Sequence, residues 1–478
     1  MNGLPAIILF AGMALVAVSS SAQIAPGQID LTKATIIAPG KLAGPEAKAI
    51  EMLLDEIAKR TRIQLPIVTK QKSRGPTISI GLASTLLRTA ELSALAVDPK
   101  WNTAEGYLIV TSDLPHPSVI VAGHDPRGVL FGVGRMLRNL HMERDRITVP
   151  AGLKIASSPY HSLRGHQLGY RPKTNSYDAW TVPMWEQYIR DLVVFGANAV
   201  ELIPPRSDDD ADSPHFPLPP MQMMVEMSRL LDSYGMDVWI WYPAMDPDYS
   251  KPETVEAAVK EWGEVFRKLP RIDAVFVPGG DPGHTQPKHL MALLSRQTAN
   301  LHRYHPKAQM WVSPQGFSQA WMDEFVGILW TEKPKWLTGV VYGPQVRGTI
   351  LQLRQNVPAQ YPIRHYPDIT HSRRCQFPVP DWDLAYALTE GREGINPRPL
   401  GEAVICRHHQ PYTVGSITYS EGCNDDVNKA VWSALEWDPK TDVREVLREY
   451  SRYFIGPGYE ESFAEGLLAL EKNWTGPL

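Results

Sequence analysis

Short apolar segments alternate with longer amphipathic segments through most of the chain after residue 159. Eight of the short segments have the composition of buried strands: 163–168, 199–203, 237–241, 274–277, 310–312, 337–341, 361–365 and 416–419. Apolar residues recur at helical spacing between most of them, for example over 185–195, 221–234, 252–268 and 288–304. Eight buried strands with intervening helices are typical of a (β/α)8 TIM barrel. We therefore predict such a barrel for residues 159–478, closed by helices after residue 425.

A smaller unit with the same kinds of element precedes the barrel, over residues 29–158. Strands are predicted at 34–37, 65–68, 77–80, 106–111 and 119–122, and an amphipathic helix at 44–60. A second helix follows Gly123 and runs to Leu140, where Gly128 and Gly132 would allow close contact with the sheet. The predicted fold class is therefore α/β, with a small N-terminal α/β domain followed by the barrel.

The first 22 residues have the pattern of a signal peptide. An apolar run over 7–18 is too short to span a bilayer comfortably, and Ser19 to Ala22 supply small residues for cleavage. No second apolar run approaches membrane length. We therefore expect a secreted or periplasmic protein without a membrane segment.

Composition narrows the possible partners and cofactors. The 478 residues carry a net charge of -4, which gives no electrostatic reason to expect nucleic acid. The three cysteines, Cys375, Cys406 and Cys423, form no disulfide framework, although one pair could bridge in an oxidising compartment. Cys406 and Cys423 could in principle bind zinc with His408 and His409, but the spacing fits no compact motif. We expect buried thiols, no metal and no cofactor.

Polar side chains gather where the predicted strands end, which is where TIM barrels bind their ligands. Carboxylates, arginines, histidines and aromatic rings together suit a sugar, which presents many hydroxyl groups and an apolar face. A carbohydrate is therefore the expected partner. The residues predicted to bind it are Arg164, Glu201, His284, Tyr342, Arg364, His365, Arg374, Asn424 and Asp426.

Three carboxylates are the predicted catalytic residues. Breaking a glycosidic bond needs a proton donor and a second group for the water or the developing positive charge. Asp281 is the leading candidate for the donor, because Gly279 and Gly280 would let the backbone turn tightly at the end of strand four. Asp368, after strand seven, is a plausible base, and Glu421 directly follows strand eight. Asp281 could instead only cap or orient a neighbour, and Glu421 could instead cap the next helix.

Arginines are frequent in the last two connections of the barrel. Arg pairs bidentately with carboxylate and sulfate groups, so their number indicates an acidic substrate. Solvated surface arginines are the alternative. The residues concerned are Arg364, Arg373, Arg374, Arg398 and Arg407.

Short motifs resemble two families of glycoside hydrolases. The segments 105–110 and 119–133 are similar to the small domain that precedes the barrel in family 20 β-N-acetylhexosaminidases and family 67 α-glucuronidases. The resemblance to family 20 implies that Arg164 and Glu421 hold the terminal sugar and that Gly279-Gly280-Asp281 carries the acid. The family's acid is the residue after that Asp, and here it is Pro282, which leaves Asp281 as the nearest acid. In the family 67 alignment, Pro282-Gly283 matches but the acidic position again lacks Glu.

Three functions are compatible with these features. The first is an exo-acting glycoside hydrolase that removes a terminal uronic acid or N-acetylhexosamine, with Asp281 as acid and Asp368 or Glu201 as its partner. The second is a catalytically inactive carbohydrate-binding barrel, which Pro282 would favour. The third is a metal-dependent lyase or hydrolase that uses the Cys and His residues around Cys406.

Overall fold

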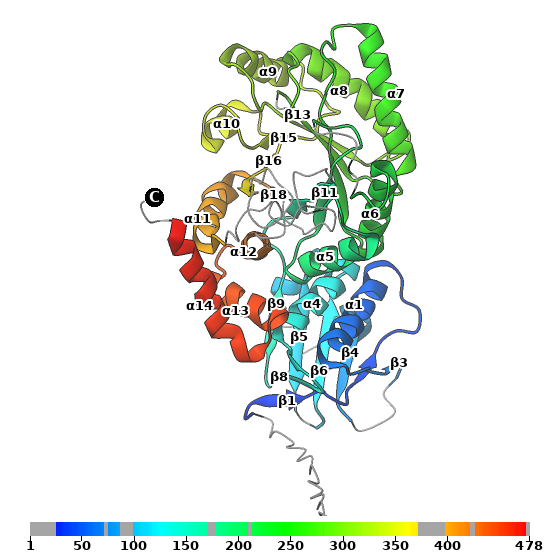
Figure 1. The fold of residues 1–478 in the computed structure, drawn as a ribbon, viewed down its shortest axis with the longest axis vertical. Coiled ribbons are helices and arrows are strands. Elements are labelled where there is room, and N and C mark those ends of the chain that lie inside the picture. Colours follow the sequence, from blue (N-terminus) through cyan, green and yellow to red (C-terminus); the bar gives the residue numbers. More distant parts are fainter. Residues whose placement is uncertain are drawn as a thin grey trace, which may run out of the picture.

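The computed structural model describes residues 25–70, 75–86, 99–113, 115–170, 177–208, 213, 215–280, 282–370, 397–420 and 426–474. The described chain folds into a small α/β layer, a barrel, and C-terminal helices that run from the barrel back toward the small layer (Figure 1).

The N-terminal layer is built on a six-stranded sheet of order β3-β2-β4-β6-β5-β9. Its strands are β2 (Thr35–Ile37), β3 (Ile67–Val68), β4 (Thr77–Leu82), β5 (Tyr107–Ser112), β6 (Ser118–Gly123) and β9 (Lys154–Ser157). A separate three-stranded sheet contains β1 (Gln28–Asp30), β7 (His141–Glu143) and β8 (Arg146–Pro150). A short helix, α2 (Ala83–Leu86), follows β4.

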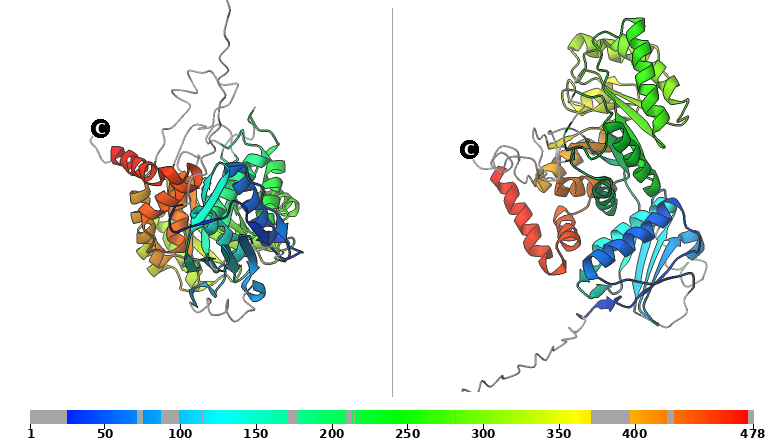
Figure 2. Two further views of the ribbon diagram at one scale, coloured as in Figure 1. Left: turned by 90° about the horizontal axis from the view of Figure 1, so that it is seen from below. Right: turned by 45° about the vertical axis from the view of Figure 1, so that its right-hand side comes forward.

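Two long helices cover the face of the six-stranded sheet that is turned toward the barrel. They are α1 (Gly44–Thr61) and α4 (Pro126–Asn139), and Figure 2 shows α1 lying across the strands. A Cβ atom on Gly132 would lie 2.8 Å from Val121 Cγ1, and one on Gly128 would lie 2.2 Å from the carbonyl oxygen of Gly106. The prediction that these glycines allow close helix-to-sheet contact is therefore confirmed.

Eight parallel strands close the barrel, as predicted. They are β10 (Leu163–Gln167), β11 (Ala199–Leu202), β12 (Asp237–Trp241), β13 (Ala274–Pro278), β14 (Gln309–Ser313), β15 (Gly339–Tyr342), β16 (Ile363–His365) and β18 (Gly415–Ser420). Each strand pairs with the next, and β18 pairs in parallel with β10 to complete the ring. The strand β17 (Asp368–Thr370) adds to β18 outside the ring.

Helices surround the barrel and continue beyond it. They are α5 (Val182–Val194), α6 (Pro220–Tyr234), α7 (Pro252–Lys268), α8 (Pro287–Leu301), α9 (Gln319–Thr331), α10 (Ile350–Asn356), α11 (Pro399–His409), α12 (Asp426–Trp437), α13 (Val443–Phe454) and α14 (Glu460–Glu471). Several, including α6, α7 and α8, begin on a proline, whose missing N–H costs nothing in the first turn. Within the described residues, no helix is long and apolar enough to cross a membrane.

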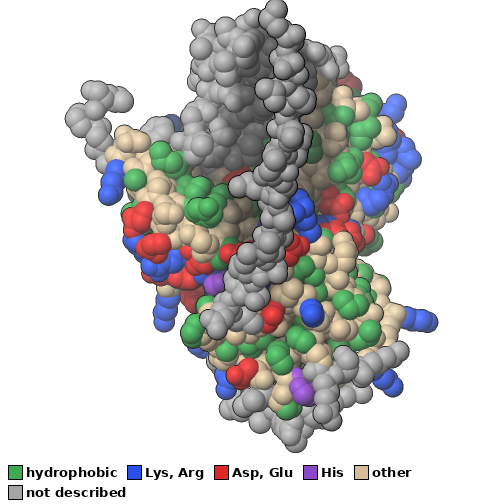
Figure 3. Space-filling model, turned by 60° about the horizontal axis from the view of Figure 1, so that its bottom comes forward, with side chains coloured by type: hydrophobic (Ala, Val, Ile, Leu, Met, Phe, Trp, Pro, Cys, Tyr) green, Lys and Arg blue, Asp and Glu red, His purple; other side chains and the backbone are tan. Residues whose placement is uncertain are grey.

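The described residues form three apolar clusters: a small one around Trp101 and Leu108 in the N-terminal layer, and two larger cores. One fills the lumen and includes Trp239, Phe276 and Ile417, whereas the larger lies between the strands and the outer helices and continues into the small domain. Where Figure 3 shows described residues, acidic and basic side chains are interspersed among hydrophobic ones.

Candidate active site at the barrel mouth

Aromatic side chains rim the described part of the lumen at the C-terminal ends of the strands. Trp241 ends β12, Tyr366 directly follows β16, and Tyr419 lies near the end of β18. All three belong to the lumen core, and the rings of Tyr366 and Tyr419 pack edge to face with centroids 6.1 Å apart. Such a rim can contact the apolar face of a sugar ring.

A fully buried ion pair crosses the lumen. Arg364 Nη1 donates to Glu201 Oε2 at 2.6 Å, although β16 and β11 are not neighbours in the barrel. Gln167 Nε2 donates to the other oxygen of Glu201 at 2.9 Å. Burial raises the pKa of Glu201, and the Arg364 guanidinium opposes that rise. Both oxygens of the Glu201 carboxylate therefore accept hydrogen bonds from within the lumen, one from Arg364 and one from Gln167.

The guanidinium of Arg364 lies among aromatic rings. Its central carbon is 4.7 Å from the ring centroid of Trp239, 4.5 Å from Phe276 and 5.5 Å from Tyr366. These contacts stabilise the buried cation through the ring quadrupoles. Arg364 Nε and Nη2 have no hydrogen-bond partner among the described residues. Within the described part of the chain, the edge of the guanidinium formed by Nε and Nη2 is thus unpaired.

The glycines at the end of strand four allow the backbone to pass very close to its neighbours. A Cβ atom on Gly279 would lie 2.5 Å from the Ser313 carbonyl oxygen, and one on Gly280 would lie 2.8 Å from the Gln315 carbonyl oxygen. Gly283 has a φ of +103° and approaches the Ala244 carbonyl oxygen. The chain on both sides of residue 281 is therefore fixed against the loops after β12 and β14.

The predicted site residues fall into three groups, and the first lies outside the described residues. Asp281, Arg374, Glu421 and Asn424 belong to it, so their predicted roles stay predictions. Residues 373 and 423, which carry an arginine and a cysteine, lie outside as well.

The second group lies at or beside the mouth. It includes the Glu201–Arg364 pair and Asp368, which is exposed on β17 opposite Tyr419. Asp426, the first residue of α12, accepts a hydrogen bond of 2.8 Å from the Tyr188 hydroxyl. His284 packs against Trp321, with ring centroids 4.5 Å apart and the rings tilted by 38°, in a cleft of about 300 Å³ beside the loops after β12 and β13.

Arg164 belongs to the third group, which lies away from the mouth. It is the second residue of β10, so it lies at the N-terminal end of the strand. It is fully buried, bonds to Glu105 Oε2 at 2.5 Å and donates to the Gly196 and His161 carbonyl oxygens. The placement corrects the prediction, because these contacts join the barrel to the small domain and leave no access to a sugar at the mouth.

Tyr342 and His365 also point away from the lumen. Along β15 and β16, Val341 and Arg364 face inward, so the adjacent Tyr342 and His365 face the outer helices. His365 stacks on His409 of α11 with centroids 4.1 Å apart, and the Tyr342 hydroxyl donates to the Gly348 carbonyl oxygen at 3.3 Å. Burial lowers the pKa of His365 well below its usual value, with His409 and Arg364 adding to the effect. Both residues pack the barrel wall instead of facing the mouth.

Cys406 lies buried on α11, and burial raises the pKa of its thiol well above the usual value. No group of three or more His, Cys, Asp or Glu side chains suited to a metal is found in the described part of the chain. Gln167, Trp239 and Phe276 are lumen residues that the sequence reasoning missed. Alternation back from Trp241 at the end of β12 could have identified Trp239, whereas alternation from the predicted Arg164 would have turned Gln167 outward.

Solved structures with the same fold are glycoside hydrolases. A family 115 4-O-methyl-α-glucuronidase with specificity for decorated arabinogalactans matches with a TM-score of 0.61 and 12% identity, over 92% of this chain and 62% of that chain. The family 20 chitobiase of Flavobacterium johnsoniae matches with a TM-score of 0.56 and 11% identity, over 93% and 71%. A family 20 β-N-acetylglucosaminidase matches with a TM-score of 0.52 and 17% identity, over 91% and 96%.

The chain spans 62% of the length of the family 115 enzyme. No protein-family model matches the sequence, and no curated protein is similar to it at the sequence level. The fold is thus that of TIM-barrel glycoside hydrolases, at low sequence identity. The sequence-based resemblance to family 20 is confirmed at the level of the fold.

Proposed function

We propose that the protein is an exo-acting glycoside hydrolase that removes a terminal uronic acid from a polysaccharide or glycan. The fold neighbours support a hydrolase of this general kind. The observation that carries the acidic substrate is Arg364. Rings cover the guanidinium, Nη1 is bonded to Glu201, and Nε and Nη2 remain without partners among the described residues. These two nitrogens form the edge of a guanidinium that binds a carboxylate bidentately.

The proposed chemistry uses two carboxyl groups. Asp281 donates its proton to the glycosidic oxygen as the bond to the anomeric carbon breaks. In one route, Asp368 takes a proton from the water that attacks this carbon. In the other, Asp368 attacks the carbon as the leaving group departs, and water then hydrolyses the resulting glycosyl ester while the Asp281 carboxylate takes its proton. The configuration of the released sugar distinguishes the two routes. Asp368 suits this role better than Glu201, because its side chain is exposed whereas that of Glu201 is fully buried.

Replacement of the acid tests the proposal. Asp281→Asn is expected to lower kcat/KM on an aryl α-glucuronide by about a hundred- to ten-thousandfold, because it removes the proton donor. Asp232→Asn, an exposed carboxylate on α6, is the matched control and should leave activity unchanged. Circular dichroism and a thermal melt check that both variants fold. A fully active Asp281→Asn protein would rule out this assignment.

An N-acetylhexosamine is the alternative terminal sugar. The family 20 structures support it through their fold, whereas Pro282 at that family's acid position argues against the family's mechanism. Parallel assays on an aryl α-glucuronide and an aryl N-acetyl-β-glucosaminide discriminate between them. Turnover of only the N-acetylated compound would contradict the assignment of Arg364.

A carbohydrate-binding protein without catalysis is the second candidate function, and Pro282 is the residue that favours it. The same barrel would then hold the sugar but lack a working proton donor. Isothermal titration with uronic acid oligosaccharides, combined with product analysis, separates the two functions. Saturable binding without release of any monosaccharide would support the binding protein.

We also infer export from the cell, on the basis of the apolar run at 7–18 and the small residues that end at Ala22. Mass spectrometry of the protein recovered outside the cytoplasm should give an N-terminus close to residue 23. An intact N-terminus in the cytoplasmic fraction alone would contradict export.

A further inference from the structure

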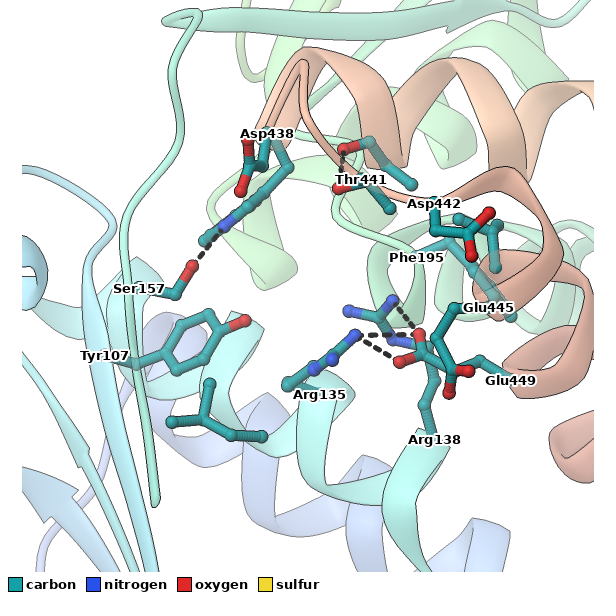
Figure 4. Close-up of a pocket in the computed structure, with 14 residues that line it drawn as sticks. Tyr107, Arg135, Arg138, Ser157, Phe195, Asp438, Thr441, Asp442, Glu445 and Glu449 are labelled. Atoms are coloured by element: carbon teal, nitrogen blue, oxygen red, sulfur yellow. Dashed lines mark hydrogen bonds and ion pairs between the residues drawn. The ribbon is translucent and has the colours of Figure 1, made fainter. Parts of the chain in front are cut away.

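A pocket of about 250 Å³ lies where the small domain meets the C-terminal helices, at the opposite end of the barrel from the mouth. Figure 4 shows its open centre between two unlike walls. The small domain contributes strands β5 and β9 and helix α4, and the C-terminal part of the chain contributes α12, α13 and the loop between them. Each wall combines residues from both parts. None of the residues predicted from the sequence to bind or cleave a substrate lines it.

One wall of the pocket is aromatic. The rings of Tyr107 and Trp437 lie 5.4 Å apart and meet at 36°. Trp437 Nε1 donates to Ser157 Oγ at 2.8 Å, which fixes the indole against the small domain. The wall therefore presents the apolar faces of two rings, and the hydrogen bond between Trp437 and Ser157 holds the indole in place.

The other wall is charged. Arg135 and Arg138 of α4 both contact Glu449 of α13, at 2.5 Å and 2.7 Å respectively. Arg138 is almost fully buried, yet its Nε has no hydrogen-bond partner among the described residues. The charged wall therefore holds its arginines mainly through the shared carboxylate of Glu449.

The charge of the lining restricts that occupant. Two arginines face four carboxylates, which gives the lining a net charge of -2. An anionic ligand is therefore disfavoured. A ligand needs hydroxyl groups that can both donate to the carboxylates Asp442 and Glu445 and accept from an arginine. It also needs an apolar face for Tyr107 and Trp437.

We propose that this junction pocket binds one neutral sugar unit, as a carbohydrate site separate from the barrel mouth. A pyranose ring has two apolar faces and a girdle of hydroxyl groups, and the volume lies below the roughly 300–1,000 Å³ of sites for drug-sized ligands, which suits a single ring. Because the lining comes from both domains, a bound sugar also strengthens their association. The proposal concerns binding alone and does not depend on hydrolysis at the mouth.

Saturation-transfer NMR on the full chain tests the proposal, with D-glucose, D-galactose, D-xylose and N-acetyl-D-glucosamine as probes and D-glucuronate as the acidic comparison. At least one neutral sugar should bind saturably. Thr441→Trp, which fills the pocket from its rim, should abolish that binding. Glu445→Gln, which keeps the shape and removes one charged acceptor, should weaken it by about tenfold.

Glu264→Gln is the matched control, because Glu264 is an exposed carboxylate on α7 outside the pocket. It should bind as the wild type does. The proposal is overturned if no neutral sugar binds, or if binding is unchanged in both pocket variants, which would place the sugar at the mouth. It is also overturned if D-glucuronate binds as tightly as the neutral sugars and is lost in Thr441→Trp. Loss of hydrolysis in Asp281→Asn leaves these outcomes unaffected.

Discussion

Glu201 and Arg364 stabilise each other only as a pair. Both side chains are fully buried, so each charge has lost its hydration, and their bond of 2.6 Å with the hydrogen bond from Gln167 compensates for that loss. The rings of Trp239 and Phe276 add to the compensation on the side of the cation. Removing one partner should therefore destabilise the fold much more than removing both.

Glu201→Gln is expected to lower the free energy of unfolding by about 3–5 kcal/mol, because it leaves the Arg364 cation uncompensated in the lumen. The double variant Glu201→Gln with Arg364→Met should recover most of that loss, since a thioether packs well against the surrounding rings. Urea denaturation monitored by tryptophan fluorescence measures both values. Arg364→Met alone completes the comparison. If the losses of unfolding free energy in Glu201→Gln and Arg364→Met simply add in the double variant, the two side chains are not energetically coupled.

The placement of single residues was only partly predictable. The sequence indicated that residues 199–203 and 361–365 form strands, and alternation then allows Glu201 and Arg364 to share the lumen. The same alternation turns Tyr342 and His365 outward, because a shift of one residue reverses the face of a strand. Arg164 was misplaced for another reason. It lies near the N-terminal end of β10, whereas TIM barrels bind their ligands at the C-terminal ends of the strands.

At the scale of the elements, the strands were predicted well because each is a short apolar run bounded by polar residues. Asp237–Trp241 and Pro252–Lys268 agree at both ends with the predicted 237–241 and 252–268. The strands β1, β7 and β8 were missed. All three are short, and β7 and β8 form a local hairpin with too few residues to show a period. The strand β1 pairs with Arg146–Pro150, which is more than a hundred residues away in the sequence. Local patterns carry no information on such contacts.

The turn after β13 gives a prediction at this scale. Gly279→Ala places a Cβ atom 2.5 Å from the Ser313 carbonyl oxygen and close to the Phe317 ring, so we expect a loss of about 1–3 kcal/mol in unfolding free energy. Activity should fall as well, because residue 281 follows this turn. The matched control is Gly327→Ala on the outside of α9, where a Cβ atom meets nothing within 4 Å. It should stabilise the protein by about 0.5–1 kcal/mol. Equal melting temperatures for the two variants would contradict the packing argument.

At the scale of the whole molecule, buried charges join the small domain to the barrel. Arg164 of β10 bonds to Glu105 in the segment before β5, and Asn198 donates to the same carboxylate at 3.0 Å. Neither this contact nor the junction pocket could be read from the sequence, because both bring together residues from distant parts of the chain.

Arg164→Met is therefore expected to weaken the docking of the two domains. The free energy of unfolding should fall by about 3 kcal/mol, because a buried carboxylate loses one of its cations. The KM for a glycoside should stay at the wild-type value at temperatures where the variant is folded. A large increase in KM without a change in stability would instead support the sugar-binding role that the family resemblance implies for Arg164.

A second buried cluster links three parts of the molecule and makes stability depend on pH. The hydroxyl oxygen of Tyr453 on α13 lies 3.1 Å from a carboxyl oxygen of Asp191 on α5 and 3.1 Å from one of Glu56 on α1, so the two carboxyl groups share this hydroxyl. Burial and the neighbouring Glu56 raise the pKa of Asp191 to about 7, against the attraction of Arg60. Burial alone would raise the pKa of Glu56, but Arg60 and Lys59 lower it to about 2.

The two shifts act in different pH ranges. Between its ordinary pKa near 4 and its folded pKa of about 7, Asp191 is protonated in the folded chain and ionised in the unfolded chain. The stabilisation that this protonated carboxyl group gives the folded state is therefore complete below about pH 4 and is lost as the pH rises to about 7. The contribution of Glu56 is present above its ordinary pKa of 4.5 and is lost only as the pH falls toward 2. Between pH 5 and pH 7, Asp191 is thus the member of this cluster that changes the stability.

Asp191→Asn keeps the shape and a hydrogen-bond acceptor but does not ionise. Relative to the wild type, the variant should gain about 2 kcal/mol in unfolding free energy between pH 5 and pH 7, because the wild type must ionise a largely buried carboxyl group beside Glu56. Urea denaturation at pH 5, 6, 7 and 8 measures the difference, and Asp232→Asn serves as an exposed control whose curve should run parallel to that of the wild type. If Asp191→Asn also runs parallel, the cluster formed by α1, α5 and α13 does not titrate in this range, and the pH dependence of the junction must come from other groups.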